Sequence, residues 1–95
     1  MQRLPTQILV DNSTSEKYTI LDIFAHDRPG LLYVITRALN ELELSIRLAK
    51  IATYIDQVVD VFYVTHRDGN KVYDELFIAE ARSKLYHAIE SWKPS

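Results

Sequence analysis

The chain has 95 residues, of which 47% are hydrophobic and 25% are charged, which suits one globular domain and excludes a disordered chain. Eleven basic and thirteen acidic residues give a net charge of −2, without the basic excess of a nucleic-acid-binding protein. The absence of cysteine excludes disulfides, thiolate metal sites and cysteine nucleophiles. We interpret the chain as a single domain over residues 1–95, with its core at about 6–92.

No apolar run approaches the roughly 18 residues of a membrane-spanning helix, so we expect no membrane contact. The first residues also lack the apolar stretch of a signal peptide. We therefore expect a cytoplasmic protein.

The first half of the chain predicts two strands and a helix. Gln7–Asp11 is a short β-like run, and residues 18–25 alternate cleanly between two faces. Asp27 is the expected N-cap of a helix. The apolar stripe of this helix consists of Leu31, Ile35, Ala38, Leu39 and Leu42.

The second half predicts two further strands and a second helix. Residues 45–54 and 58–65 have strand patterns, and a β-bulge near residue 49 or 50 would switch the phase of the earlier one. A strong turn follows at 67–70. The last element is a helix over about 73–92.

This ββαββα order indicates the α+β class. Two helices on one face of a four-stranded antiparallel sheet bury both apolar stripes economically. A ferredoxin-like domain has the order βαββαβ, whereas here no strand pattern follows 73–92 and an extra strand, 7–11, precedes the others. We therefore predict a ferredoxin-like sheet in which the N-terminal strand replaces the usual last strand.

The sheet face away from the helices should be polar if it meets water. We instead expect apolar residues on it, namely Tyr18, Ile20 and Phe24 from one strand and Val58, Phe62 and Val64 from another. Either this is the slightly apolar surface of a monomer, or it is an interface with another copy or a second domain. We favour the interface. Asp22 and Asp60 are expected on the same face, as polar contacts.

The segment His-Asp-Arg-Pro-Gly-Leu-Leu at 26–32 joins a strand to a helix N-terminus. Free N–H groups there can bind a carboxylate. Gly30 permits close approach to the backbone, and Asp27 can accept from an α-ammonium group. Both charges of an amino-acid zwitterion would then have partners. The alternative is a capped helix that simply follows a tight turn.

The sequence from this strand through Asp-Arg-Pro-Gly-Leu-Leu at 27–32 resembles ACT domains, ferredoxin-like modules that sense amino acids and other small ligands. Residues 50–54 and 59–65, followed by Asp-Gly at 68–69, are similar to the C-terminal ACT domain of the bifunctional PII uridylyltransferase/uridylyl-removing enzymes. The resemblance covers residues 5 to about 90.

The resemblance implies a regulatory domain of a nitrogen-control protein, with an amino acid, glutamine, as its ligand and no cofactor. It also implies pairing with another ACT domain, either a second copy or a second domain of a parent chain. The implied ligand-binding residues are Asp27, Arg28, Gly30, Leu31 and Leu32 in the loop and Ala49, Ile51 and Thr53 on a strand of a neighbouring ACT domain.

The chain lacks the Gly-Ser pair and spaced aspartates of a nucleotidyltransferase. We therefore expect no catalysis by this chain alone, whether it is a fragment of a uridylyltransferase or a standalone ACT protein.

Other functions are weaker alternatives. A ligand-free ACT module that only pairs domains fits the same residues. An acylphosphatase-like enzyme needs an arginine-bearing glycine loop, but only one glycine accompanies Arg28. An RNA-recognition motif needs glycines and basic residues in the strand at 58–65, which has neither. His26, His66 and His87 are too scattered to predict a metal site.

Overall fold

Residues 5–55 and 57–92 are described by a computed structural model of the chain. They form six elements in the predicted order ββαββα. These elements are β1 (Gln7–Asp11), β2 (Thr19–His26), α1 (Leu31–Glu41), β3 (Leu44–Tyr54), β4 (Gln57–His66) and α2 (Glu75–Ser91). The predicted strands differ from the observed ones by at most one residue at either end.

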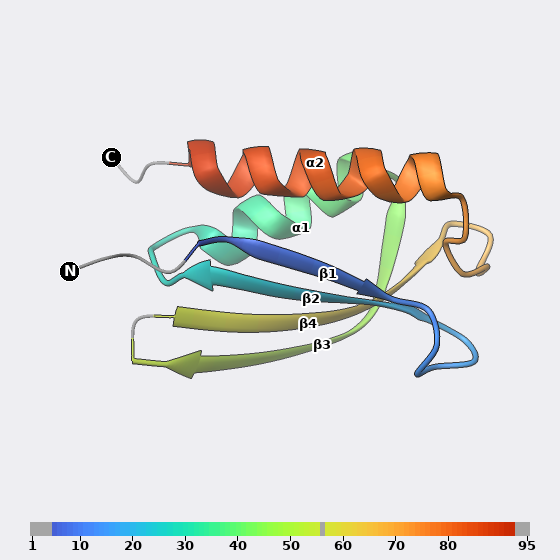
Figure 1. Ribbon diagram of the computed structural model, residues 1–95, viewed down its shortest axis with the longest axis horizontal. Coiled ribbons are helices and arrows are strands. Elements are labelled where there is room, and N and C mark those ends of the chain that lie inside the picture. Colours follow the sequence, from blue (N-terminus) through green and yellow to red (C-terminus); the bar gives the residue numbers. More distant parts are fainter. Residues whose placement is uncertain (1–4, 56, 93–95) are drawn as a thin grey trace.

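The described strands form one antiparallel sheet in the order β1-β2-β4-β3. β1 lies at the edge beside β2, with Ile8 opposite Ile23 and Val10 opposite Leu21. This edge is where a ferredoxin-like domain has its last strand, so the predicted replacement by 7–11 is confirmed. Both helices pack on the same side of the sheet (Figure 1).

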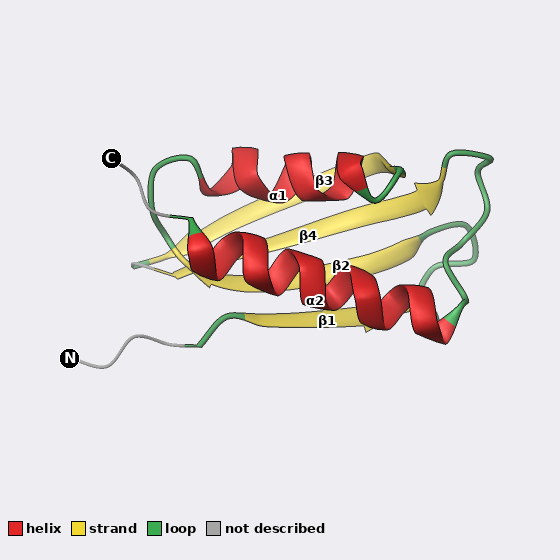
Figure 2. Ribbon diagram, turned by 90° about the horizontal axis from the view of Figure 1, so that it is seen from above, coloured by secondary structure: helices red, strands yellow, loops and turns green. Residues whose placement is uncertain are grey.

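The core lies between the helices and the sheet. Viewed from the helix side, α2 runs along β1 and β2, whereas α1 lies toward β3 and β4 (Figure 2). Leu39 of α1 and Leu85 and Ile89 of α2 are fully buried, and each such burial contributes about 1.5–3 kcal/mol. The predicted apolar stripe of α1 therefore does face the sheet.

The pairing of β2 with β4 overturns one prediction. Phe62 lies opposite Leu21, and antiparallel partners point to the same side of a sheet. Both side chains are buried beneath the helices, and Phe62 is only 1% exposed. The predicted place of Phe62 on the open face is therefore wrong. The same correction applies to Val58 and Val64, which also belong to the core.

The error has a simple cause in the sequence of β4. Val59, Val61 and Tyr63 form one apolar alternation, and Val58, Phe62 and Val64 form the other. Asp60 lies in the second set, and an acidic residue there suggests that this side of the strand faces solvent. Hydrophobic patterning therefore does not determine the phase of this strand.

The open face carries the predicted residues of β2. Ile20 lies opposite Tyr63 and Phe24 opposite Val59, so both point away from the helices. Ile20 is nevertheless only 4% exposed. The rings of Tyr18 and Tyr63 meet edge to face at 6.2 Å on this side and supply apolar cover without a helix.

β3 forms the other edge of the sheet and is exposed along most of its length. Its exposed apolar side chains are Ile46, Leu48, Ile51 and Tyr54. The register shifts between Ile46 and Leu48, so the bulge lies at Arg47 and not at the predicted position 49 or 50. After this shift, Ala49, Ile51 and Thr53 share the helix-facing side with Phe62 and its neighbours on β4.

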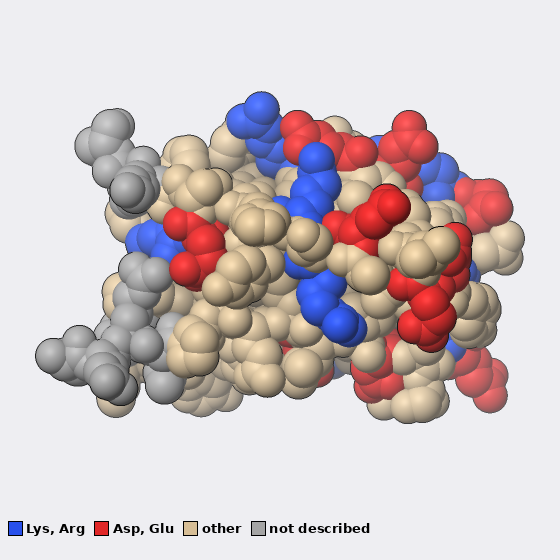
Figure 3. All heavy atoms as spheres, turned by 45° about the horizontal axis from the view of Figure 1, so that its top comes forward, with Lys and Arg blue, Asp and Glu red and all other residues tan. Residues whose placement is uncertain are grey.

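The surface above the helices has charges of both signs. Acidic and basic side chains are interspersed over the face shown in Figure 3. Glu41 of α1 pairs with Arg37 at 3.5 Å and with Lys84 of α2 at 3.2 Å. These exposed pairs contribute little to stability. None of the described helices is long and apolar enough to cross a membrane.

Thr19 makes the hydrogen bonds that join the start of β2 to two loops. Its Oγ1 donates to Asn12 Oδ1 at 2.6 Å and accepts from the Val72 N–H at 2.8 Å, while the residue is 1% exposed. We predict that Thr19→Val lowers the free energy of unfolding by about 1–3 kcal/mol, because the buried Val72 N–H and the half-buried Asn12 side chain lose their partner. Urea unfolding would measure this. Thr53→Val, at an exposed strand position, should change stability by less than about 0.5 kcal/mol.

Candidate functional site

The loop between β2 and α1 ends in a tight turn. Gly30 has φ 81° and ψ 0°, in the left-handed region that glycine adopts readily. The Leu31 N–H donates to the Arg28 carbonyl at 3.2 Å, and the Val34 N–H donates to the Gly30 carbonyl at 3.1 Å. The helix therefore begins at Leu31. The predicted N-cap role of Asp27 is wrong, because this turn separates Asp27 from the helix.

The first turn of α1 has backbone donors to offer. With the N–H groups of Leu31 and Val34 already bonded, those of Leu32 and Tyr33 have no acceptor within the described part of the chain. The side chains of Leu32 and Tyr33 are exposed, and the first turn contains no acidic residue. The positive end of the helix dipole is thus available to an anionic group.

Residues at the end of α2 and directly after it contact the loop between β2 and α1. Trp92 Nε1 donates to the Pro29 carbonyl at 2.8 Å, and the Arg28 guanidinium donates to the Ile89 carbonyl. A cation at the last carbonyls of a helix is favourable. A Cβ at Gly30 would lie 2.6 Å from Trp92 Cζ2. The indole therefore fills the side of Gly30 that we expected a ligand to approach.

The predicted strand residues lie on the helix-facing side, but none of the described helices covers them. Ala49 is opposite Phe62, Ile51 opposite Asp60 and Thr53 opposite Val58. All three predicted residues are exposed, and Ile51 is 52% exposed. We call Ala49, Ile51 and Thr53 the β3 strip. In Figure 2, the loop after β2 passes over the hairpin end of β3 and β4 on this same side.

The predicted position of Asp60 on the open face of the sheet is wrong. Asp60 lies opposite Ile23, on the helix side and not on the open face as predicted, and is 2% exposed. Its Oδ1 has no hydrogen-bond partner among residues 5–55 and 57–92. Burial, and secondarily the negative charge of Asp27, raise the pKa of Asp60 to about 6. In the sequence, the available signal for this site was an acidic residue between two valines, Val59 and Val61.

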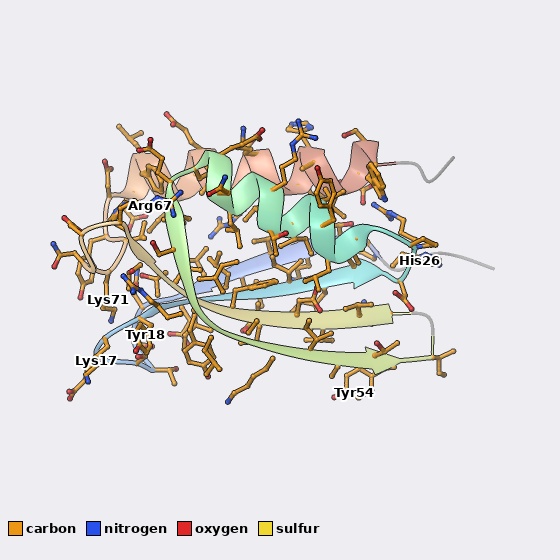
Figure 4. All side chains as sticks on the ribbon, turned by 180° about the vertical axis from the view of Figure 1, so that it is seen from behind. Lys17, Tyr18, His26, Tyr54, Arg67 and Lys71 are labelled. Atoms are coloured by element: carbon orange, nitrogen blue, oxygen red, sulfur yellow. The ribbon has the colours of Figure 1, made fainter. Side chains whose placement is uncertain are left out.

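The structure thus places Asp27 of the loop close enough to Asp60 to affect its pKa, and Asp60 beside Ile51 of the β3 strip. Tyr18 lies away from these residues, at the opposite end of the sheet from His26 and Tyr54 (Figure 4).

At the Tyr18 end of the sheet, a hollow of about 410 Å³ is lined by Lys17, Arg47 and Lys71 among others. The Lys71 ammonium donates to the carbonyls of Asn12 and Ser15 at 2.7 and 2.6 Å, which ties two loops together.

A metal site is not formed by the residues that the structure describes. They contain no group of three or more His, Cys, Asp or Glu side chains placed to hold an ion. The arrangement around α1 instead offers backbone donors for an anion and carboxylates for a cation.

The family model described as "ACR9-like, ACT-like domain" matches residues 7–91 of this chain. The chain belongs to the ACT-like domain family. This confirms the resemblance to ACT domains stated for residues 27–32. No solved structure gives a significant match to this ACT-like domain.

Curated relatives of this ACT-like domain are much longer enzymes. The bifunctional uridylyltransferase/uridylyl-removing enzyme of Azospirillum brasilense is 45% identical over 86 residues, which are 90% of this chain and 9% of that enzyme. The enzyme of the same name from Rhodospirillum rubrum is 38% identical over 96% of this chain and 10% of its own length. The one from Ruegeria pomeroyi is 45% identical over 90% and 10%. The chain therefore spans about a tenth of the length of these relatives.

The contact between Trp92 and Gly30 predicts unequal effects of two similar substitutions. Gly30→Ala would strain a positive φ and also press on the indole, so it should lower the free energy of unfolding by about 2–4 kcal/mol. Gly69→Ala is the matched control, because Gly69 has φ 90° and open space around its missing side chain. It should cost only about 1–2 kcal/mol. Equal losses in urea unfolding would contradict the role given to Trp92.

Asp60 predicts a distinctive pH dependence of stability. Its folded pKa of about 6 exceeds the unfolded value of 3.8, so the protonated form favours folding. The contribution is fully present below pH 4 and is lost as pH rises through 6, a difference of about 3 kcal/mol. Asp60→Asn should remove this decline and stabilise the protein at pH 7. Asp22→Asn, on the open face, should leave the decline unchanged, as urea unfolding at several pH values would measure.

Proposed function

We propose that this domain is a regulatory amino-acid sensor of a PII uridylyltransferase-type nitrogen-control protein, that its ligand is glutamine and that it acts in the cytoplasm. The observation that supports this most directly is the pairing of opposite binding features at one place. The unbonded N–H groups of Leu32 and Tyr33 suit a carboxylate, and Asp27 lies in the loop that leads to them. An α-amino acid carries both complementary charges.

We propose that the partner is another ACT domain, a second copy or a second domain of a parent chain, and that it pairs along β3. Beyond the bulge at Arg47, this edge strand presents exposed Leu48, Ile51 and Tyr54 and can act as a template for a further strand. A neighbour paired there would bring its own β3 strip toward the loop. The half-buried residues Tyr18 and Phe24 of the open face, beside Ile20, are a secondary contact surface in this proposal.

The proposed mechanism is linkage and not catalysis. An amino acid that binds one arrangement of paired domains more tightly shifts the population toward that arrangement. The names of the relatives describe transfer and removal of a uridylyl group, and a domain about a tenth of their length would regulate such activities.

A ligand-free pairing module is the second candidate, and one observation favours it. Trp92 fills the open side of Gly30, and the Arg28 guanidinium is bonded to the Ile89 carbonyl. Two residues predicted to bind ligand are thus engaged with α2. The bond to Ile89 also removes Arg28 from the phosphate-binding role that an acylphosphatase would need.

Thermal melting with and without glutamine tests the proposal. Ligand that binds only the folded state stabilises it by about 2.7 kcal/mol at a hundredfold excess over Kd. We expect millimolar glutamine to raise Tm and equal concentrations of serine and glutamate to have a smaller effect. Asp27→Ala should abolish the rise, whereas Glu80→Ala, at an exposed position of α2, should retain it.

The same experiment at several protein concentrations separates the two candidates. A Tm that rises with protein concentration but not with any of the three amino acids would support the pairing module and contradict sensing by this domain. A glutamine effect that survives Asp27→Ala would contradict the proposed site.

A further inference from the structure

We infer that the carboxylate of Asp60 accepts the α-ammonium group of the ligand, so that this site selects molecules with a protonated amine beside a carboxylate. The inference rests on the proposed amino-acid-binding function and adds to it the residue that recognises the amine. Asp60 lies outside the loop and the strand that the family resemblance implied.

The place of Asp60 in the sheet supports this role. On one side its partner is Ile23, which is 0% exposed, and on the other side it is Ile51, which is 52% exposed. Asp60 therefore lies where the core gives way to the uncovered β3 strip. A ligand that occupied this strip beneath the loop would rest directly beside the carboxyl group.

The hydrogen bonding of Asp60 is incomplete in the free domain. Its Oδ1 is buried and has no partner within the described part of the chain. A buried acceptor without a donor is unfavourable, and a buried charge is more so. An ammonium group would supply both a donor and the opposite charge.

The charged groups around Asp60 leave that position open for a cation. Asp27, from the loop, is close enough to influence it and is also acidic. One terminal nitrogen of Arg28 donates to the Ile89 carbonyl, while its Nε is buried without a partner within the described part of the chain. His26 lies at the loop end of β2, opposite Gln57 and on the open face. Lys50, from β3, lies over the ring of Tyr63 on the open face. The charged group that shifts the pKa of Asp60 is therefore the acid Asp27 and not one of the described cations.

An α-amino acid has its ammonium and carboxylate groups on the same carbon atom. In the inferred arrangement, the carboxylate accepts from the N–H groups of Leu32 and Tyr33, the ammonium group lies between Asp27 and Asp60, and the side chain extends along the β3 strip. The ammonium group would also relieve the repulsion between the two acids.

Binding of a cation to Asp60 requires its ionised form, so affinity should depend on pH. Because the pKa of Asp60 is about 6 in the free domain, lowering the pH from 7.5 to 5 should weaken binding about tenfold. This direction is opposite to the pH dependence of stability, in which acid favours the folded protein.

Isothermal titration of the 95-residue chain tests the inference with two probes, L-glutamine and 4-carbamoylbutanoate, which is glutamine without its α-amine. At pH 7.5 we expect wild type to bind glutamine about a hundredfold more tightly. Asp60→Asn should weaken glutamine binding about ten- to a hundredfold, change binding of the analogue less than threefold and abolish the pH effect. Glu80→Gln, at an exposed position of α2, should behave as wild type.

The outcomes separate this inference from the proposed function. If Asp60→Asn keeps the preference for glutamine over the analogue, the inference is wrong and amino-acid binding stands. If wild type binds glutamine and 4-carbamoylbutanoate equally, the site does not recognise the amine, and the inference is wrong whatever the variants show. If wild type binds none of glutamine, serine or glutamate, the proposed function fails, and this inference fails with it.

Discussion

The register between β2 and β4 is the constraint on which the remaining structure depends. It pairs Leu21 with Phe62 and Ile23 with Asp60, and so decides which side of the two central strands meets the helices. A shift of one residue would turn Phe62 outward and bring Val61 and Tyr63 beneath α1 and α2. The same register places Asp60 inside and, through β4, turns Ile51 toward the helix side at the exposed edge.

The parts of the fold that could be predicted are those with one unambiguous pattern. The N-terminal strand was predictable because a polar turn separates it from β2, and the helices because each has one apolar stripe. The phase of β4 was not, because both of its faces are apolar and the acid lies on the buried one. The contact of Trp92 with Pro29 was hidden too, since it joins residues 63 positions apart along the chain.

The start of α1 shows how a loop can be held firmly and still keep binding capacity. On one side, the indole of Trp92 and the carbonyl of Ile89 engage Gly30 and Arg28. On the other side, the first backbone donors of the helix have no acceptor among the described residues. These contacts fix the loop to the end of α2, so they join the start of α1 to the end of α2.

The inferred role of Asp60 would give ligand binding an energetic effect on the state of the domain. A ligand shifts an equilibrium only by the difference in its affinity for two states. At neutral pH the unpaired carboxylate disfavours the free folded domain, so any group that pairs with it gains that difference on binding. Replacing Asp60 by an apolar residue would give a more stable sheet without this source of coupling. A residue that lowers the stability of the free folded domain can thus increase the free-energy difference between the free and the liganded states.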